Sequence, residues 1–111
     1  MTTPEHLNLL VKEIHQNAIE HGFWDKSQNV GEKVALICGE ISGEFLEAYR
    51  KDDIHPDDHC PDFSNQEIEL ADTFIRLLDL VGWLRCDKFG ETVIAKMTYN
   101  RTRPHLHGKK F

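Results

Sequence analysis

The sequence predicts an all-α protein, and two observations carry this prediction. Apolar residues recur at three- and four-residue spacing in four segments, whereas no run alternates apolar and polar residues as a half-buried strand would. The tetrapeptide at 64–67, Ser-Asn-Gln-Glu, is a capping box, in which serine and glutamate side chains satisfy backbone amides at a helix start. With 111 residues, 40% of them hydrophobic, the chain is expected to form one domain over 1–111.

The first two predicted helices cover residues 3–21 and about 31–51, and a turn-rich segment connects them. In the first helix, the apolar residues at helical spacing are Leu7, Leu10, Val11, Ile14 and Ala18. The second helix contains Gly39 and Gly43, each of which costs about 1 kcal/mol relative to alanine. This cost suggests that a neighbouring helix or a ligand approaches the backbone closely at these glycines.

The third predicted helix starts after the capping box and runs to about residue 85, and the fourth covers 91–101. Between residues 69 and 84 of this helix the charged residues fall on one side, and they are Glu69, Asp72, Arg76 and Asp79. Apolar residues cover most of its remaining circumference, which is more than one small chain can bury. We therefore expect the four helices to form a bundle that is completed by a homodimer or a dimer of dimers.

The charge of the chain is unevenly distributed. The formal net charge is −6, but residues 88–111 carry +5 and the rest of the chain carries −11. An acidic body argues against binding of duplex nucleic acid, which requires a broad basic face. The sequence has no recognisable signal peptide, no apolar run long enough to span a membrane and no C-x-x-C pair, so we expect a cytoplasmic protein that does not bind membranes.

Two groups of acidic residues define a candidate metal site. Glu40, Glu44 and Glu47 share one face of the second helix, and Glu69 and Asp72 lie one turn apart on the third. If the two helices pack antiparallel, these carboxylates converge and repel one another unless a cation binds there. Oxygen ligands select Mg²⁺ or Mn²⁺ over zinc. The alternative is that both groups are ordinary solvated helix faces.

The spacing Glu44-x-x-Glu47, then Glu69-x-x-Asp72, resembles the signature of the MazG-like, all-α nucleoside triphosphate pyrophosphohydrolases. Five further segments resemble the short bacterial and phage members: GFW (22–24), EKVALICGE (32–40), EAYRKD (47–52), ELADTFIRLLDL (69–80) and KMTYNRTRPHLHGKKF (96–111). The resemblance implies Mg²⁺-dependent cleavage of a nucleoside triphosphate to a monophosphate and pyrophosphate, in the service of nucleotide-pool housekeeping. It also implies that Glu44, Glu69 and Asp72 are catalytic.

One departure from this family pattern concerns the first acidic group. Members commonly show E-x-x-E-x-x-E, whereas this chain has Glu40-x-x-x-Glu44-x-x-Glu47, one residue longer at the front. The partner of Glu44 at the metal is therefore either Glu40 or Glu47.

The resemblance also suggests substrate-binding residues, which are Lys96, Asn100 and either Arg101 or Arg103. A lysine and an arginine suit the terminal phosphates as charge partners. Arg76 either pairs with Asp72 or reaches a phosphate, and Phe23 or Trp24 is a candidate for stacking on the base.

Two other interpretations of the sequence stay open. One is a related enzyme of the phosphoribosyl-ATP pyrophosphohydrolase type, which shares the helical arrangement of carboxylates. The other is a non-catalytic helical module that keeps the fold and binds a nucleotide or a protein.

Overall fold

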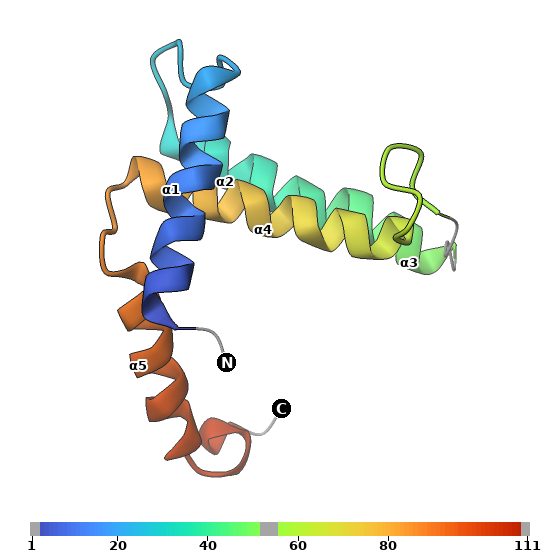
Figure 1. Ribbon diagram of the computed structural model, residues 1–111. Coiled ribbons are helices and arrows are strands. Elements are labelled where there is room, and N and C mark those ends of the chain that lie inside the picture. Colours follow the sequence, from blue (N-terminus) through green and yellow to red (C-terminus); the bar gives the residue numbers. More distant parts are fainter. Residues whose placement is uncertain (1–2, 52–55, 110–111) are drawn as a thin grey trace.

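The computed structural model describes residues 3–51 and 56–109. All of the secondary-structure elements assigned within these ranges are helices (Figure 1). The elements are α1 (Pro4–Glu20), α2 (Val30–Gly39), the π-helix η1 (Glu40–Phe45), α3 (Leu46–Arg50), α4 (Asn65–Trp83), α5 (Phe89–Arg101) and the 3₁₀-helix η2 (His105–Gly108). The predicted all-α class is therefore confirmed. The start of the predicted 52–63 loop, residues 52–55, lies outside the described residues.

Three helices begin at a side-chain cap, as the sequence pattern indicates. Thr3, Asn29 and Ser64 each accept a hydrogen bond from the backbone amide three residues later, at 3.2–3.3 Å. In the predicted capping box the Ser64 hydroxyl also contacts Glu67 Oε1 at 3.4 Å. Such caps satisfy amides that have no partner within the helix, and they fix where each helix begins.

The second predicted helix consists of three consecutive elements, α2, η1 and α3, which form one rod. This rod lies along α4 and runs in the opposite direction (Figure 1). Its middle turn is π-helical, so that the chain widens over residues 40–45 before it returns to an α-helix. The antiparallel pairing predicted for these helices is confirmed, and it places the two acidic groups on neighbouring elements.

The helix α1 crosses the C-terminal half of α4, and α5 extends beyond the N-terminal end of α1 (Figure 1). The core at this crossing contains Val11, Leu78 and Val81, with Ile14 and Phe89 packed against it. The Asn8 side chain accepts a hydrogen bond from the Gly90 amide and donates one to Glu91, both at 2.7 Å, which ties α5 to α1.

Close backbone approach occurs at glycines other than those predicted. A Cβ atom at Gly82 would lie 2.6 Å from His15 Cβ, and one at Gly90 would collide with the Pro4 carbonyl oxygen. No such neighbour lies within 4 Å of a Cβ at Gly39 or Gly43. The close contact expected at Gly39 and Gly43 is therefore not made within the described part of the chain.

The single chain is open in shape and leaves much apolar surface exposed. Its radius of gyration is 16.3 Å, whereas a compact chain of this length has about 13 Å. On α4, Leu70, Phe74 and Leu77 follow one another at helical spacing and are 45%, 44% and 40% exposed. No helix in the described ranges is long and apolar enough to cross a membrane.

Candidate metal and substrate site

Three carboxylates converge where η1 lies against α4. Glu40 comes from the first residue of η1, and Glu69 and Asp72 lie one turn apart on α4. One carboxylate oxygen of each residue lies within 4.8 Å of those of the other two. We call these three residues the carboxylate cluster. Its donors come from both predicted acidic groups, because the antiparallel pairing of the rod with α4 brings them together.

The structure places Glu44 and Glu47 differently with respect to this cluster. Glu44 lies close enough for its charge to raise the pKa of Glu69. Glu47 has a side chain that is 56% exposed, and it pairs with Lys51 Nζ at 3.2 Å. Of the two candidate metal ligands that flank Glu44, this arrangement favours Glu40, and Glu44 itself lies outside the cluster.

A π-helical turn spans the interval between Glu40 and Glu44. A turn closed by i→i+5 hydrogen bonds contains about one residue more than an α-helical turn. Glu40 opens this turn, and Glu44 lies near its end. Residues four apart also share a face in an α-helix, so the wider turn keeps Glu40 and Glu44 on the same side of the rod.

The cluster carries an excess of negative charge. Burial, followed by the charges of Asp72, Glu40, Glu44 and Asp57, raises the pKa of Glu69 above its ordinary value of 4.5. Burial and the charges of Glu40 and Asp57 also raise the pKa of Asp72, and Arg76 acts in the opposite direction. Asp57 was not predicted as part of this site, since it lies in an aspartate-rich loop with no periodic pattern. Such a cluster favours the binding of a cation.

Within residues 3–51 and 56–109, Arg76 is a cation that contacts the cluster directly. Its Nε donates to Glu40 Oε1 at 2.8 Å, so its partner is Glu40 and not Asp72, with which the sequence suggested a pair. The Glu40 side chain is 15% exposed and the Arg76 side chain is 40% exposed. Arg76 therefore neutralises part of the cluster while its guanidinium remains accessible from the adjacent cavity.

A cavity of about 250 Å³ adjoins the cluster on the side of α1. It is lined by Ile14, Asn17, Ala18, Phe23, Glu40, Asp72, Ile75, Arg76 and Asp79. Two carboxylates of the cluster thus form one wall, and apolar side chains and the Asn17 amide form the others. A ligand in this cavity would meet an aromatic ring, an arginine and the acidic cluster at once.

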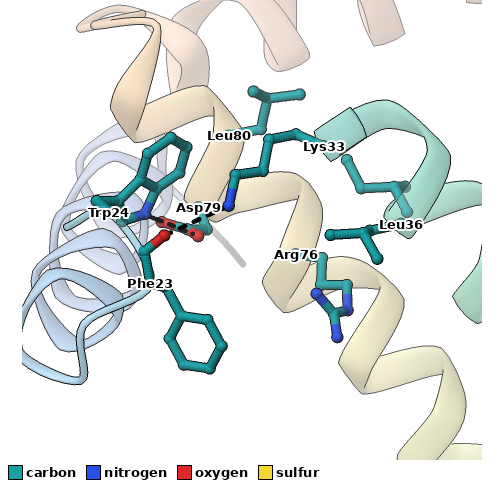
Figure 2. Close-up of a pocket in the computed structure, with 8 residues that line it drawn as sticks. Phe23, Trp24, Lys33, Leu36, Arg76, Asp79 and Leu80 are labelled. Carbon is teal, nitrogen blue, oxygen red and sulfur yellow. Dashed lines mark hydrogen bonds between the residues drawn. The ribbon is translucent and has the colours of Figure 1, made fainter. Parts of the chain in front are cut away.

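Trp24 belongs to a packed network next to this cavity (Figure 2). Its Nε1 donates to both carboxylate oxygens of Asp79 at 2.9 and 3.1 Å. His15 Nδ1 lies 2.7 Å from Asp79 Oδ1. The indole stacks on Trp83 with ring centroids 5.3 Å apart, and Lys33 Nζ lies 4.3 Å from its ring.

Trp24 is therefore held as a structural element, and the ring available for stacking is that of Phe23, which is 60% exposed. The sequence placed Asp79 on the charged side of α4 but gave no sign of its two partners, because His15 and Trp24 are far from it in the chain.

The predicted phosphate-binding residues lie elsewhere in the chain. Lys96 Nζ is 4.8 Å from the Tyr99 ring centroid, and Arg103 Cζ is 5.6 Å from the same ring. Asn100 Oδ1 is buried without a hydrogen-bond partner. These residues belong to α5 and the segment that follows it, and α5 packs on the N-terminal half of α1 (Figure 1). The structure of one chain therefore does not bring them to the carboxylate cluster.

Comparisons of the chain with protein families, curated proteins and solved structures found no match. The resemblance to the MazG-like enzymes therefore stays a prediction from the motif residues.

Proposed function

We propose that this protein is a Mg²⁺-dependent pyrophosphohydrolase that converts a (deoxy)nucleoside triphosphate to the monophosphate and pyrophosphate. The observation that carries the proposal is the juxtaposition of the carboxylate cluster with a cavity of about 250 Å³. The cavity contains an aromatic ring for a base and an arginine for a phosphate, and Glu40 and Asp72 of the cluster lie in its wall. The acidic residues that match the MazG-like signature include Glu69 and Asp72, two of the three members of the cluster.

The chemistry of the cluster fits a hard divalent cation. All three residues offer carboxylate oxygens, and Mg²⁺ is typically held by a few carboxylates together with water and substrate phosphates. Burial and the charges of neighbouring carboxylates raise the pKa values of Glu69 and Asp72, and a bound cation would offset both effects. When bound, Mg²⁺ supplies charge neutralisation for the phosphates and a lowered pKa for a coordinated water. Mn²⁺ has the same preference for oxygen ligands and could replace it.

The residues of the chain then take distinct roles. Glu40, Glu69 and Asp72 would hold the metal. Glu44, which lies beside the cluster but outside it, would position the attacking water and accept its proton. Arg76 would exchange its contact with Glu40 for a phosphate oxygen of the substrate, since its side chain is 40% exposed at the cavity. Phe23 would stack on the base, and the Asn17 side chain in the cavity wall would hydrogen-bond to it or to the sugar.

We further propose that the protein works as a homodimer or a dimer of dimers. The exposed apolar stripe of Leu70, Phe74 and Leu77 and the open shape of one chain support this proposal. A second copy would bury these side chains, and this burial stabilises a dimer by about 25 cal/mol per Å² of apolar surface. Size-exclusion chromatography with light scattering should therefore give at least twice the mass of 12.9 kDa.

The test is an assay of each dNTP and NTP with Mg²⁺, with Mn²⁺ and with EDTA, followed by identification of the products. Monophosphate and intact pyrophosphate, lost with EDTA, are the expected result. Diphosphate and orthophosphate would contradict the proposed bond cleavage. Absence of turnover in a protein that still binds Mg²⁺ would favour a non-catalytic nucleotide-binding module.

A further inference from the structure

We propose that Asp79 selects the base of the substrate, and that the cavity accepts a base with an amino group at the position where uracil, thymine and hypoxanthine have a carbonyl oxygen. Cytosine and adenine are the common bases of this class. The proposal rests on the proposed function and adds the chemical class of the substrate. It gives Asp79 a role of its own, because Asp79 is not a member of the carboxylate cluster.

The Asp79 side chain lies in the cavity wall, at a distance from the cluster that suits a nucleotide. Asp72, Arg76 and Asp79 follow one another at four- and three-residue spacing, so they share one face of α4, and all three line the cavity. The seven residues from Asp72 to Asp79 span about 10 Å along the helix. A mononucleotide has a similar distance between its α-phosphate and the outer edge of its base. A nucleotide that lies along α4 with its phosphates at the cluster therefore brings its base to Asp79.

The Asp79 carboxylate is held in one orientation by two side chains from other parts of the chain. Trp24 Nε1 donates to Oδ1 at 2.9 Å and to Oδ2 at 3.1 Å (Figure 2). His15 Nδ1 lies 2.7 Å from Oδ1, and it must be the donor, because a carboxylate only accepts hydrogen bonds. The Trp24 ring is itself fixed by stacking on Trp83. Since the Asp79 side chain is only 16% exposed, its carboxylate is a pre-oriented acceptor in the cavity wall.

One oxygen of this carboxylate can accept a further hydrogen bond. A carboxylate oxygen has about two acceptor positions. Oδ1 of Asp79 uses both, for Trp24 and His15, whereas Oδ2 accepts only from Trp24 within the described ranges. In the same part of the chain, no lysine or arginine forms an ion pair with Asp79. A ligand in the cavity that brings an N–H group to Oδ2 would therefore fill an open position.

A fixed carboxylate distinguishes an amino group from a carbonyl oxygen. The amino group of cytosine or adenine can donate to Asp79, and proteins use aspartate and glutamate in this way to recognise cytosine. A carbonyl oxygen at the same position would place two acceptors against each other, and Oδ2 would lose water without gaining a donor. The other base-binding groups do not discriminate in this way. Phe23 can stack on any base, and Asn17 can present either its amide oxygen or its amide nitrogen.

The first test compares pairs of nucleotides that differ chiefly in this group, dCTP with dUTP and dATP with dITP. Their α,β-imido analogues, which resist cleavage, are titrated into the wild-type protein with Mg²⁺ in a calorimeter. In each pair that binds, we expect the amino member to have a Kd that is lower by about tenfold or more. Equal binding within a pair, tighter binding of the carbonyl member, or no binding of any of the four would overturn the inference.

The second test is the variant Asp79→Asn. Its amide oxygen should take the place of Oδ1, which accepts from both His15 and Trp24, so that the amide N–H group replaces Oδ2. The preference should then reverse, with the dUTP analogue bound at least as tightly as the dCTP analogue. The matched control is Asp87→Asn, an exposed residue outside this cavity, which should keep the wild-type preference. An unchanged preference in folded Asp79→Asn would overturn the inference, and the wild-type comparison decides it if this variant does not fold.

These binding measurements separate the inference from the proposed function. If the wild type binds the amino members more tightly but hydrolyses none of the parent nucleotides, the proposed function fails and the assignment of Asp79 stands. If it hydrolyses dUTP as efficiently as dCTP and dITP as efficiently as dATP, the proposed function stands and the assignment of Asp79 fails.

Discussion

The two halves of α4 serve different purposes. At the C-terminal half, where α1 crosses it, Leu78 is fully buried, Val11 and Val81 are 6% exposed, and the backbone of Gly82 lies against His15. At the N-terminal half, η1 and α3 pack alongside (Figure 1), but Leu70 of α4 and Ile41 of η1 are 45% and 39% exposed. One helix therefore takes part in two different regions. The first is the tightly packed crossing with α1. The second, which we call the acidic arm, is the N-terminal half of α4 together with η1 and α3, and it contains the carboxylate cluster.

The crossing and the acidic arm therefore have different roles: the crossing stabilises the fold, and the arm presents groups that can bind a ligand. The crossing stabilises the fold through burial of apolar side chains and close contact of backbones. The arm carries carboxylates whose pKa values are raised, so its charges work against folding until a cation is bound. Substitutions in the crossing should therefore affect the stability of the fold, and substitutions in the arm should affect metal binding and activity.

The largest effect is expected for Glu69→Gln, which removes one oxygen donor of the cluster. Loss of a group that merely supports a metal ligand costs about 10- to 100-fold, so loss of the ligand itself should lower kcat/KM at least about 100-fold. The matched control is Glu47→Gln, in the same acidic stripe, because Glu47 is exposed and pairs with Lys51. It should retain activity within about threefold of the wild type, in line with the small contribution of an exposed ion pair.

Steady-state kinetics with the preferred nucleotide would measure both effects, and circular dichroism would verify that both variants are folded. Equal losses in the two variants would contradict the assignment of Glu40, rather than Glu47, to the metal side of the rod.

The next largest effect concerns stability and compares two glycines. Gly82→Ala places a methyl group 2.6 Å from His15 Cβ, and overpacking of this kind costs about 1–3 kcal/mol. Gly43→Ala adds the same methyl group where nothing lies within 4 Å, so it should stabilise the helix by about 0.5–1 kcal/mol. Urea denaturation of both variants in the absence of metal would give the two free energies of unfolding.

If Gly43→Ala is instead strongly destabilising, a group from outside the single chain must contact the backbone at Gly43 in the folded protein. A second copy is the candidate, and repeating the denaturation at several protein concentrations would identify it, because the unfolding midpoint of a dimer depends on concentration.

A smaller effect links Mg²⁺ to pH through Glu69 and Asp72. Because the folded protein raises both pKa values, it binds protons more tightly than the unfolded chain. The stability of the metal-free protein should therefore fall as pH rises from the ordinary values of 4.5 and 3.8 through the raised ones. Mg²⁺ reverses this penalty at neutral pH, and at ten times its Kd it should add about 1.4 kcal/mol.

Thermal unfolding at pH 4 and pH 7.5, with and without Mg²⁺, measures this linkage. The increase in Tm caused by Mg²⁺ should be larger at pH 7.5 than at pH 4, because the raised pKa values of Glu69 and Asp72 favour the protonated, non-binding form of both carboxyls at the lower pH. In Glu69→Gln it should be small at both values. An equal increase at both values of pH would mean that Mg²⁺ binds elsewhere.

Most of the helices could be predicted from the sequence, because apolar spacing and N-terminal caps are local signals. The predicted ranges 3–21 and 91–101 agree with α1 and α5 to within two residues. The π-helical turn was not predicted, because its residues fit a regular amphipathic α-helix equally well. The packing of α5 was also not predictable, since it depends on contacts such as that between Gly90 and Pro4, which are far apart in the chain.

The candidate site was predicted in part for the same reason. Glu40, Glu69 and Asp72 could be identified because acidic residues at helical spacing define a face, and an antiparallel pair brings two faces together. The contributions of Asp57 and of the network around Asp79 depend on loop and tertiary contacts that leave no periodic trace in the sequence.

The smallest effect is expected where the π-turn is removed. Deleting Ser42, an exposed residue, should let the rod continue as an α-helix with Glu40 still facing α4, because the wide turn contains about one residue too many for an α-helical turn. The stabilisation by Mg²⁺ should then change by no more than about 0.5 kcal/mol, as for other surface changes.

The matched control deletes Ala71, which is also exposed, from the regular helix α4. This deletion rotates Glu69 by about 100° relative to Asp72 and should abolish the stabilisation by Mg²⁺. If the Ser42 deletion loses Mg²⁺ binding as completely as the Ala71 deletion does, then the π-turn is itself part of the site and does more than absorb an inserted residue.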